Sequence, residues 1–202
     1  RVMVLHRWKK IILTLVWLLA GILALTACTK EKPHQPADFF PMTKGSFWEY
    51  EGEGNEFASF TREVLYTDGN RAQFREDNGG TVMATVLETT DTAVIRVFSR
   101  GEAYGDENYL EKQATENTIL LKAPVQVGTK WEVQDGTKEI TDVDVTVPTP
   151  AGEFQGCIAV TGNYGESTVV EYYKAGIGLV KREFTSGETK VTSSLKRYEI
   201  KK

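Results

Sequence analysis

Histidine is scarce in this 202-residue chain, which contains only two of them. His6 lies in a basic N-terminal segment and His34 in a polar stretch further on, so residues 35–202 contain none. A Ser-His-Asp triad, a Cys-His dyad and a histidine-bearing zinc site all need the imidazole side chain. The sequence therefore argues against all three kinds of site, and we expect a protein that is not an enzyme and holds no metal and no cofactor.

Cysteine is equally scarce, and nucleotide-binding motifs are missing. Cys28 and Cys157 are the only cysteines, and Cys157 opens a Cys-Ile-Ala-Val run that is typical of a strand. We expect Cys157 to be a small buried apolar residue and not a nucleophile. The chain has no P-loop, and Gly-Ile-Gly at residues 176–178 is too short for a dinucleotide fingerprint. The net charge of −4 argues against a nucleic-acid partner.

The first 27 residues differ in composition from the rest of the chain. They contain four basic residues and no acidic residue, whereas residues 28–202 carry a net charge of −8. Residues 11–25 form a run of fifteen residues without a charge. As a helix this run would span about 22 Å, which is shorter than the roughly 30 Å of bilayer hydrocarbon. A basic start, a short apolar run and small residues at its end predict a secretory signal peptide over residues 1–27.

Leu25-Thr26-Ala27-Cys28 closes the apolar run. This segment resembles the lipobox of bacterial lipoproteins, in which a Leu, a small residue and Ala or Gly precede an obligatory Cys. In that family the signal peptide is cut just before the cysteine, and the cysteine sulfur carries a diacylglyceryl group, whose two chains suffice for stable anchoring. The resemblance implies lipid attachment at Cys28 and a place at the extracytoplasmic face of the cell membrane. An uncleaved signal anchor with a chance cysteine is the alternative.

Residues 28–38 predict a tether between this anchor and the folded part of the chain. The stretch contains two prolines and four charged residues. Such a composition favours an extended, solvated chain that reaches on the order of 30 Å when it is fully polyproline-like. We therefore expect a β domain over residues 39–202, held just outside the membrane.

Short runs rich in β-branched residues, separated by turn signals, occupy much of residues 39–202. The runs cover residues 81–87, 92–98, 142–147, 157–160, 168–173 and 178–184. Glycine-containing turn signals typical of hairpins stand at residues 68–70, 78–80, 135–136 and 186–187. The pattern predicts an all-β fold built as an antiparallel meander. Alternation over residues 142–147 predicts that Val143, Val145 and Val147 share one face of a strand.

One segment of the chain recurs with a constant offset of 83 residues. The matching residues are Pro41, Gly45, Trp48 and Glu49 in the first copy and Pro124, Gly128, Trp131 and Glu132 in the second. We predict two related units of about 85 residues, 39–121 and 122–202, that form a curved sheet, a half-barrel or a sandwich. In each unit the tryptophan begins the first strand as a core anchor. A chance coincidence of turn and strand is the alternative.

Three stretches of the β region also resemble a loose group of secreted and lipid-anchored bacterial proteins, most familiar from Gram-positive lineages. They are residues 39–50, 147–154 and 172–181. These stretches carry no catalytic motif. The resemblance therefore implies an exported all-β protein and implies no activity.

Carboxylates are the remaining candidates for polar chemistry. Asp135, Glu139, Asp142 and Asp144 lie close together in the sequence but lack the order of an EF-hand loop. We expect an exposed acidic sheet face there, with weak Ca²⁺ binding as the alternative. The many other acidic residues offer pairs for a glycosidase mechanism, but no spacing singles one pair out.

Tyr164, Tyr172 and Tyr173 form an aromatic-rich region. The ordinary interpretation is core or sheet face, and the sharper hypothesis is a ligand cleft. Two classes of function follow. The first is a lipid-anchored, extracytoplasmic, non-enzymatic binding module for a small apolar or amphiphilic ligand, by analogy with other curved sheets. The alternative is an envelope structural or protein-interaction lipoprotein that contacts wall polymer or another protein.

Overall fold

The structure, a computed structural model, describes residues 33–202. The predicted signal peptide, Cys28 and the first part of the predicted tether lie outside these residues. The described chain forms one 3-10 turn, η1 (Pro36–Phe39), and the strands β1 (Phe47–Glu53), β2 (Phe60–Asp68), β3 (Arg71–Asp77), β4 (Val82–Thr89), β5 (Ala93–Arg100), β6 (Thr118–Lys122), β7 (Lys130–Val133), β8 (Gly136–Thr149), β9 (Gly152–Tyr164), β10 (Ser167–Lys174), β11 (Gly178–Ser186) and β12 (Thr189–Glu199). The predicted all-β fold is confirmed.

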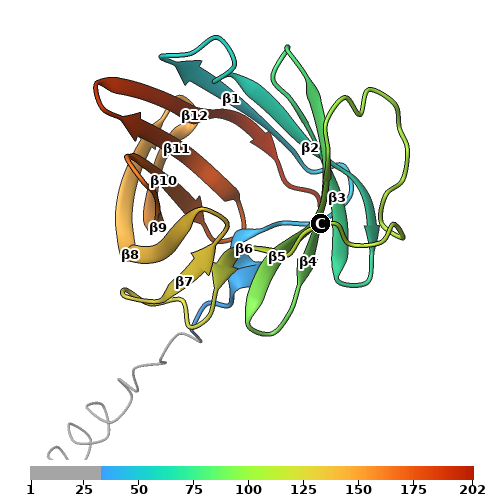
Figure 1. Cartoon of the computed structure of the whole chain (residues 1–202), viewed down its shortest axis with the longest axis horizontal. Helices are drawn as coiled ribbons and strands as arrows, with labels where there is room; N and C mark the ends of the chain where they lie inside the picture. The colour runs from blue at the N-terminus through green and yellow to red at the C-terminus, as the bar shows by residue number, and fades with distance from the viewer. Residues whose placement is uncertain (1–32) are drawn as a thin grey trace, which may run out of the picture. The chain divides into compact units, whose positions relative to one another are not determined.

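All of these strands belong to one antiparallel sheet with the order β6-β5-β4-β3-β2-β1-β12-β11-β10-β9-β8-β7. The chain reaches one edge of the sheet at β6, begins again at the other edge with β7, and finally pairs β12 with β1. Laid flat, twelve strands would separate the two edges by roughly 50 Å. The seven residues that join β6 to β7 span less than about 30 Å. The sheet therefore curls into a ring in which β6 and β7 are neighbours (Figure 1).

The hairpin turns stand where the sequence predicts them. Residues 68–70 join β2 to β3, and residues 78–80 join β3 to β4. Asp135 ends the turn before β8 with a φ of 62°, a left-handed conformation that aspartate tolerates better than most residues. Gly187 has a φ of 55° between β11 and β12. The turns after β1, β3, β5, β7, β9 and β11 lie at one end of the ring, which we call the hairpin end.

The prediction that three valines share a face of β8 is wrong for one of them. Val147 is buried, whereas Val143 is 39% exposed. The pairing of β8 with β9 shifts register between Ile140 and Asp142, and again on either side of Val145. Because each irregularity inserts an unpaired residue, the strict two-residue alternation of faces is lost along this strand.

The two tryptophan segments begin with the same local geometry. Gly45 and Gly128 have φ values of 82° and 88°, which suit glycine because it has no Cβ. The Gly45 N–H donates to the carbonyl of Val64 at 2.8 Å, and the Gly128 N–H donates to the carbonyl of Ile140 at 2.9 Å. Val64 and Ile140 are both fully buried, on the strand that follows each tryptophan strand.

The tryptophans occupy matching positions as well. Trp48 is the second residue of β1 and Trp131 the second residue of β7, and they are 2% and 5% exposed. Burial of both side chains agrees with their predicted role as core anchors. The larger prediction, that residues 39–121 and 122–202 are two copies of one unit, stays a prediction.

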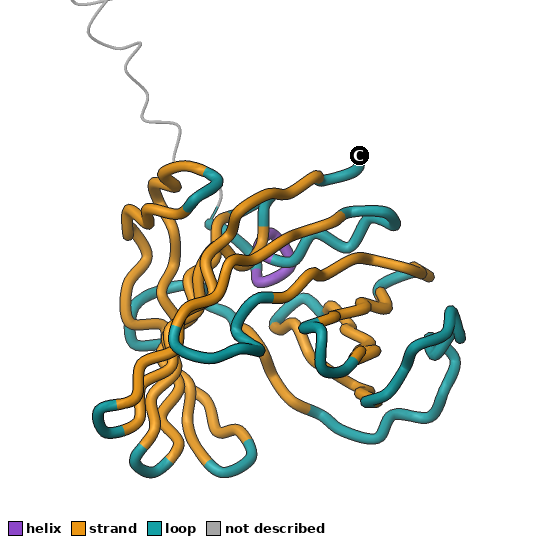
Figure 2. Tube along the Cα trace, turned by 90° about the horizontal axis from the view of Figure 1, so that it is seen from above, coloured by secondary structure: helices purple, strands orange, loops and turns teal. Residues whose placement is uncertain are grey.

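The residue stretch before β1 packs against the sheet and closes the end of the ring opposite the hairpin end. Pro36 and Phe39 of η1 are buried, and the Gly176 N–H between β10 and β11 donates to the carbonyl of Asp38 at 2.7 Å. Figure 2 shows η1 in purple, set against the strands. Residues 36–38, which the sequence predicts as part of the tether, therefore belong to the folded part. We call this end of the ring the η1 end.

Not all of the buried apolar surface lies inside the ring. Ala84, Val86 and Val97 form a second cluster with Tyr109 and Leu110. The last two residues belong to the long loop between β5 and β6, which covers the outer face of the sheet there. Among residues 33–202, no helix is long and apolar enough to cross a bilayer.

Candidate ligand-binding cavity

A cavity of about 510 Å³ lies inside the ring, lined by side chains of β2 to β6 and of β8 to β11. Ligand sites for small molecules typically measure about 300–1,000 Å³. Because residues alternate between the two faces of a strand, every second residue of these strands points into this space. On β10 the inward residues are Val169, Glu171 and Tyr173.

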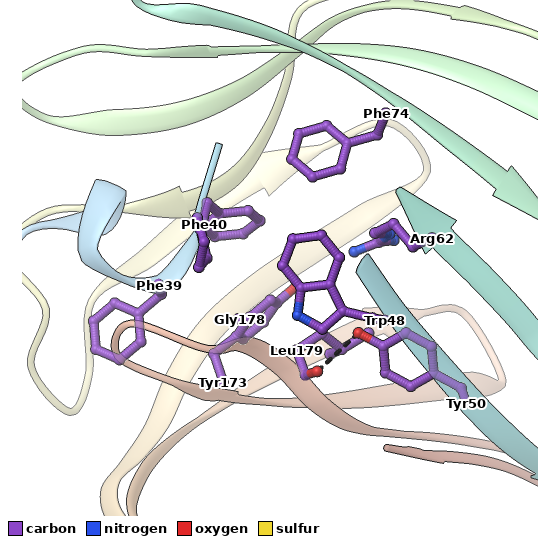
Figure 3. Close-up of a pocket in the computed structure, with 10 residues that line it drawn as sticks. Phe39, Phe40, Trp48, Tyr50, Arg62, Phe74, Tyr173, Gly178 and Leu179 are labelled. Atoms are coloured by element: carbon purple, nitrogen blue, oxygen red, sulfur yellow. Dashed lines mark hydrogen bonds between the residues drawn. The ribbon is translucent and has the colours of Figure 1, made fainter. Parts of the chain in front are cut away.

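Aromatic side chains close the cavity at the η1 end. Phe40 follows η1 and lies 5.1 Å from the ring of Tyr173, and Phe74 comes from β3 (Figure 3). The space left between these rings, Trp48 and Tyr50 is about 10 Å³, which is the volume of a single water probe. Access to the cavity therefore comes from the hairpin end.

Hydrogen bonds hold these aromatic side chains in place. The Tyr50 hydroxyl donates to the carbonyl of Leu179 at 2.8 Å, as the dashed line in Figure 3 marks. The Trp48 indole N–H donates to the carbonyl of Ile177 at 2.7 Å. Both acceptors lie at or next to the start of β11, and both donors lie on β1. The aromatic side chains at this end of the cavity, which we call the aromatic floor, are therefore held by strands from opposite ends of the chain.

The cavity wall near the hairpin end carries charged side chains. Arg62 of β2 donates from Nε and Nη2 to one oxygen of Glu76 on β3, at 3.1 and 2.6 Å. Burial by itself would raise the pKa of Glu76, but the adjacent Arg62 and Arg182 guanidinium groups outweigh it and hold this pKa below its usual value. The pair is therefore ionised at neutral pH.

A second carboxylate, that of Glu171, contacts two cationic side chains. Glu171 accepts a hydrogen bond from Lys138 Nζ at 2.7 Å, and Arg182 Nε lies 3.4 Å from its other oxygen. Burial would raise the pKa of Glu171, but the attraction of Lys138 and Arg182 outweighs burial and lowers this pKa to about 2. The side chains of Lys138 and Glu171 are only 8% and 10% exposed, so this pair is screened little by solvent.

The lining of the cavity has more positive than negative charge. Its cations are Arg62, Arg96, Lys138 and Arg182, and its carboxylates are Glu76 and Glu171. Arg96 is neutralised by Glu116 just outside the lining, at 2.9 Å. One positive charge therefore remains without a counter-charge in the wall.

The structure brings together two of the three predicted cleft tyrosines. Tyr164 and Tyr173 line the cavity, and whether they contact a ligand stays a prediction. Tyr172 does not, because it lies on the opposite face of β10 from Tyr173 and its hydroxyl donates to Glu183 at 3.1 Å. Burial and the neighbouring Glu183 carboxylate raise the pKa of Tyr172 to about 12.

The remaining candidates from the sequence lie elsewhere. Cys157 is fully buried, as predicted, and its thiol donates to the carbonyl of Phe154 at 3.3 Å. Burial raises the pKa of this thiol to about 11. Asp142 and Asp144 are exposed, and the Asp142 carboxylate accepts the Val143 and Asp144 N–H groups. Over residues 33–202 no group of three or more His, Cys, Asp and Glu side chains is arranged to hold a metal ion.

Sequence reasoning missed the charged wall of the cavity. In the sequence, polar or charged residues flank each of Arg62, Glu76, Lys138 and Arg182. For a charged residue in such a stretch, a solvent-exposed position is the ordinary expectation. Glu171 gave one signal that could have been used. It stands between Val169 and Tyr173 with a spacing of two residues, so an acid shares the inward face of a strand with two large apolar residues.

Comparison with known proteins assigns the chain to no family. No protein-family model and no curated protein matches the chain. Among solved structures, one from Bacteroides fragilis, described as an exported protein with a YmcC-like fold, is 16% identical, with a TM-score of 0.49 over 80% of this chain and 98% of that one. Another, from Parabacteroides distasonis and described as a lipoprotein, is 14% identical, with a TM-score of 0.48 over the same shares of the two chains.

Proposed function

We propose that the protein is a lipid-anchored, extracytoplasmic and non-enzymatic binding module that holds a small amphiphilic ligand inside the ring. The observation that carries the proposal is the cavity of about 510 Å³, which has an aromatic floor and a charged wall. Protein interiors are close-packed, and voids larger than a water molecule are few. A space of about 510 Å³ that opens at the hairpin end lies in the range of small-molecule sites, and a bound molecule would fill it.

The chemistry of the lining favours a ligand with both polar and apolar parts. Met83, Leu87 and Leu120 present apolar surface from β4 and β6, while Arg62 and Arg182 present charge from β2 and β11. Purely apolar ligands would leave the charged groups desolvated without new partners, which is costly. A purely polar solute would gain nothing from the apolar side and the aromatic floor.

The predicted anchor supports a place for this cavity relative to the membrane. Cys28 precedes the buried Pro36 by eight residues, which span at most about 29 Å. A diacylglyceryl group at Cys28 would hold the η1 end of the ring near the membrane surface, with the hairpin end free to meet ligand outside it.

Native mass spectrometry tests the proposal directly. The exported protein, released from membranes in mild detergent, should carry a non-covalent adduct of a few hundred daltons or its exchanged detergent equivalent. Val169→Trp, which fills the cavity from β10, should remove the adduct. Val170→Trp is the matched control, because it places the same side chain on the opposite face of the same strand. An adduct that survives Val169→Trp would overturn the proposal and favour an envelope structural or protein-interaction role.

A further inference from the structure

The charged wall of the cavity is not balanced. Arg62 and Glu76 neutralise each other at 2.6 Å, whereas Glu171 alone faces both Lys138 and Arg182. A charge that is partly removed from water is stabilised by a counter-charge or by hydrogen-bond partners. The Arg182 side chain is 32% exposed, so it is accessible to such a partner. The wall therefore has one cation more than its carboxylates can neutralise.

Arg182 is the cation with unused hydrogen-bonding capacity. A guanidinium has five N–H donors. Across residues 33–202, Glu171 is the one carboxylate within 4 Å of the Arg182 guanidinium, at 3.4 Å, and Glu76 attracts it from further away. The guanidinium itself donates no hydrogen bond to these residues. Its guanidinium carbon lies 5.6 Å from the ring centre of Phe60, a cation–π distance that fixes the group in place.

Arg182 also lies near the entrance of the cavity, where an entering molecule would contact it. It lines the main cavity and a second hollow of about 250 Å³ that adjoins it at the hairpin end. The second hollow is bordered by Phe57 and Asn78 from two hairpin turns. A polar head group near the entrance would therefore reach Arg182 while a tail extended toward Leu87 and Leu120.

From this imbalance we infer that the ligand is an acidic amphiphile with one oxyanion head group. The proposal rests on the proposed function and names its ligand class. Arg182 donates N–H groups to the oxyanion, and Lys138 and Arg62 add their attraction. The apolar tail lies against the β4 and β6 side of the cavity. Planar oxyanions suit a guanidinium because two parallel N–H groups can bond two oxygens at once.

Photocrosslinking in membranes tests the inference with the full-length protein. The probes are dodecanoic acid, dodecyl phosphate and dodecanol, each with a diazirine in the chain. Peptide mapping then reports whether label reaches cavity-lining residues. We expect both acidic probes to label these residues about tenfold or more above the alcohol, as a charge-assisted hydrogen bond implies. A large excess of acetate or inorganic phosphate should not compete, because neither has a tail.

Matched variants separate the head-group contact from the cavity itself. Arg182→Gln should reduce acid labelling to the level of the alcohol while leaving alcohol labelling unchanged. Glu171 keeps its 2.7 Å bond to Lys138 in this variant, so the fold should persist. Arg75→Gln is the control, because the Arg75 side chain is 33% exposed against 32% for Arg182 but lies on the outer face of β3.

The outcomes distinguish the inference from the proposed function. Equal labelling by acid and alcohol, both blocked by Val169→Trp, would overturn the acidic head group and leave the binding module intact. Competition by acetate or inorganic phosphate would mean a simple anion site and would also overturn it. If no probe labels the cavity residues, both the proposed function and the inference are refuted.

Discussion

Trp131 on β7 donates its indole N–H to the main-chain carbonyl of Ile119 on β6, at 3.0 Å. These are the two edge strands of the sheet, and every other junction of the ring is a backbone ladder. One buried side chain thus supplies a hydrogen bond at the place where main-chain pairing stops. Trp48, its counterpart in the other tryptophan segment, instead bonds Ile177 beside β11.

Trp131→Phe should loosen this junction. Phenylalanine keeps most of the buried ring but removes the donor, so we expect a loss of about 0.5–1.5 kcal/mol in the free energy of unfolding. Amide hydrogen exchange should become faster in β6 and β7 and stay unchanged in β1 and β12. Equal acceleration in both pairs of strands would contradict a local role for the bond at the junction.

Trp48→Ala and Trp131→Ala should each lower stability strongly and to a similar extent. Truncation of a buried tryptophan costs about 3–5 kcal/mol, and both side chains are at most 5% exposed. Thermal melting measures the loss. Fluorescence tests the burial in a full-length protein from which the two tryptophans before residue 27 have been removed. When Trp48→Ala or Trp131→Ala is added, the one indole that remains should give blue-shifted emission that iodide quenches poorly. A fully quenched indole would contradict its burial.

Glu171→Gln should destabilise the protein strongly, although glutamine and glutamate have nearly the same size. The change leaves Lys138 and Arg182 without their shared carboxylate, and breaking a buried pair costs about 3–5 kcal/mol. Adding Lys138→Met should restore part of the loss, because the two residues are coupled. Urea unfolding measures both. Glu49→Gln is the control, since its partners Lys196 and Arg197 are at least half exposed and we expect a much smaller loss.

The lowered pKa of the Glu171 carboxylate predicts that the protein loses stability in acid. Its pKa is about 2 in the folded protein against an ordinary value of 4.5, so the folded state favours the ionised form. The resulting stabilisation is complete above about pH 4.5 and is lost as the pH falls toward 2, by about 3 kcal/mol in all. Urea midpoints between pH 7 and 2 should fall less steeply for Glu171→Gln than for the wild type, and parallel slopes would contradict this.

Local signals in the sequence were sufficient to predict the all-β class, many of the strands and the hairpin turns, but no run was singled out over β2, β3, β6 or β12. Asn78-Gly79-Gly80 needs left-handed backbone, and Gly79 has a φ of 79°. Such chemistry depends only on neighbouring residues, so it can be recognised without the fold. The pairing of β1 with β12 could not be recognised in this way. Its contacts, such as Glu49 with Arg197, join residues 148 positions apart, and no local pattern encodes them.

The candidate site was predictable only in part for a related reason. Tyr172 and Tyr173 are adjacent in the sequence, and which of them faces inward depends on the register of β10 with its neighbours. A shift of one residue exchanges the two faces of a strand. The charged wall needs the curvature of the whole ring, because Lys138, Glu171 and Arg62 come from three separate strands.

Cys28→Ser should abolish lipid attachment. The prediction rests on Leu25-Thr26-Ala27-Cys28 at the end of an apolar run, and on the thiol as the only group there that resembles a lipobox acceptor. Serine has nearly the same size but an oxygen in place of the sulfur, so acylation and the cleavage that depends on it should both fail. Cells grown with labelled fatty acid should incorporate label into the wild type and into Cys157→Ser, whose cysteine is buried in the ring. Label that persists in Cys28→Ser, or that never enters the wild type, would refute the anchor and with it the proposed position of the cavity outside the membrane.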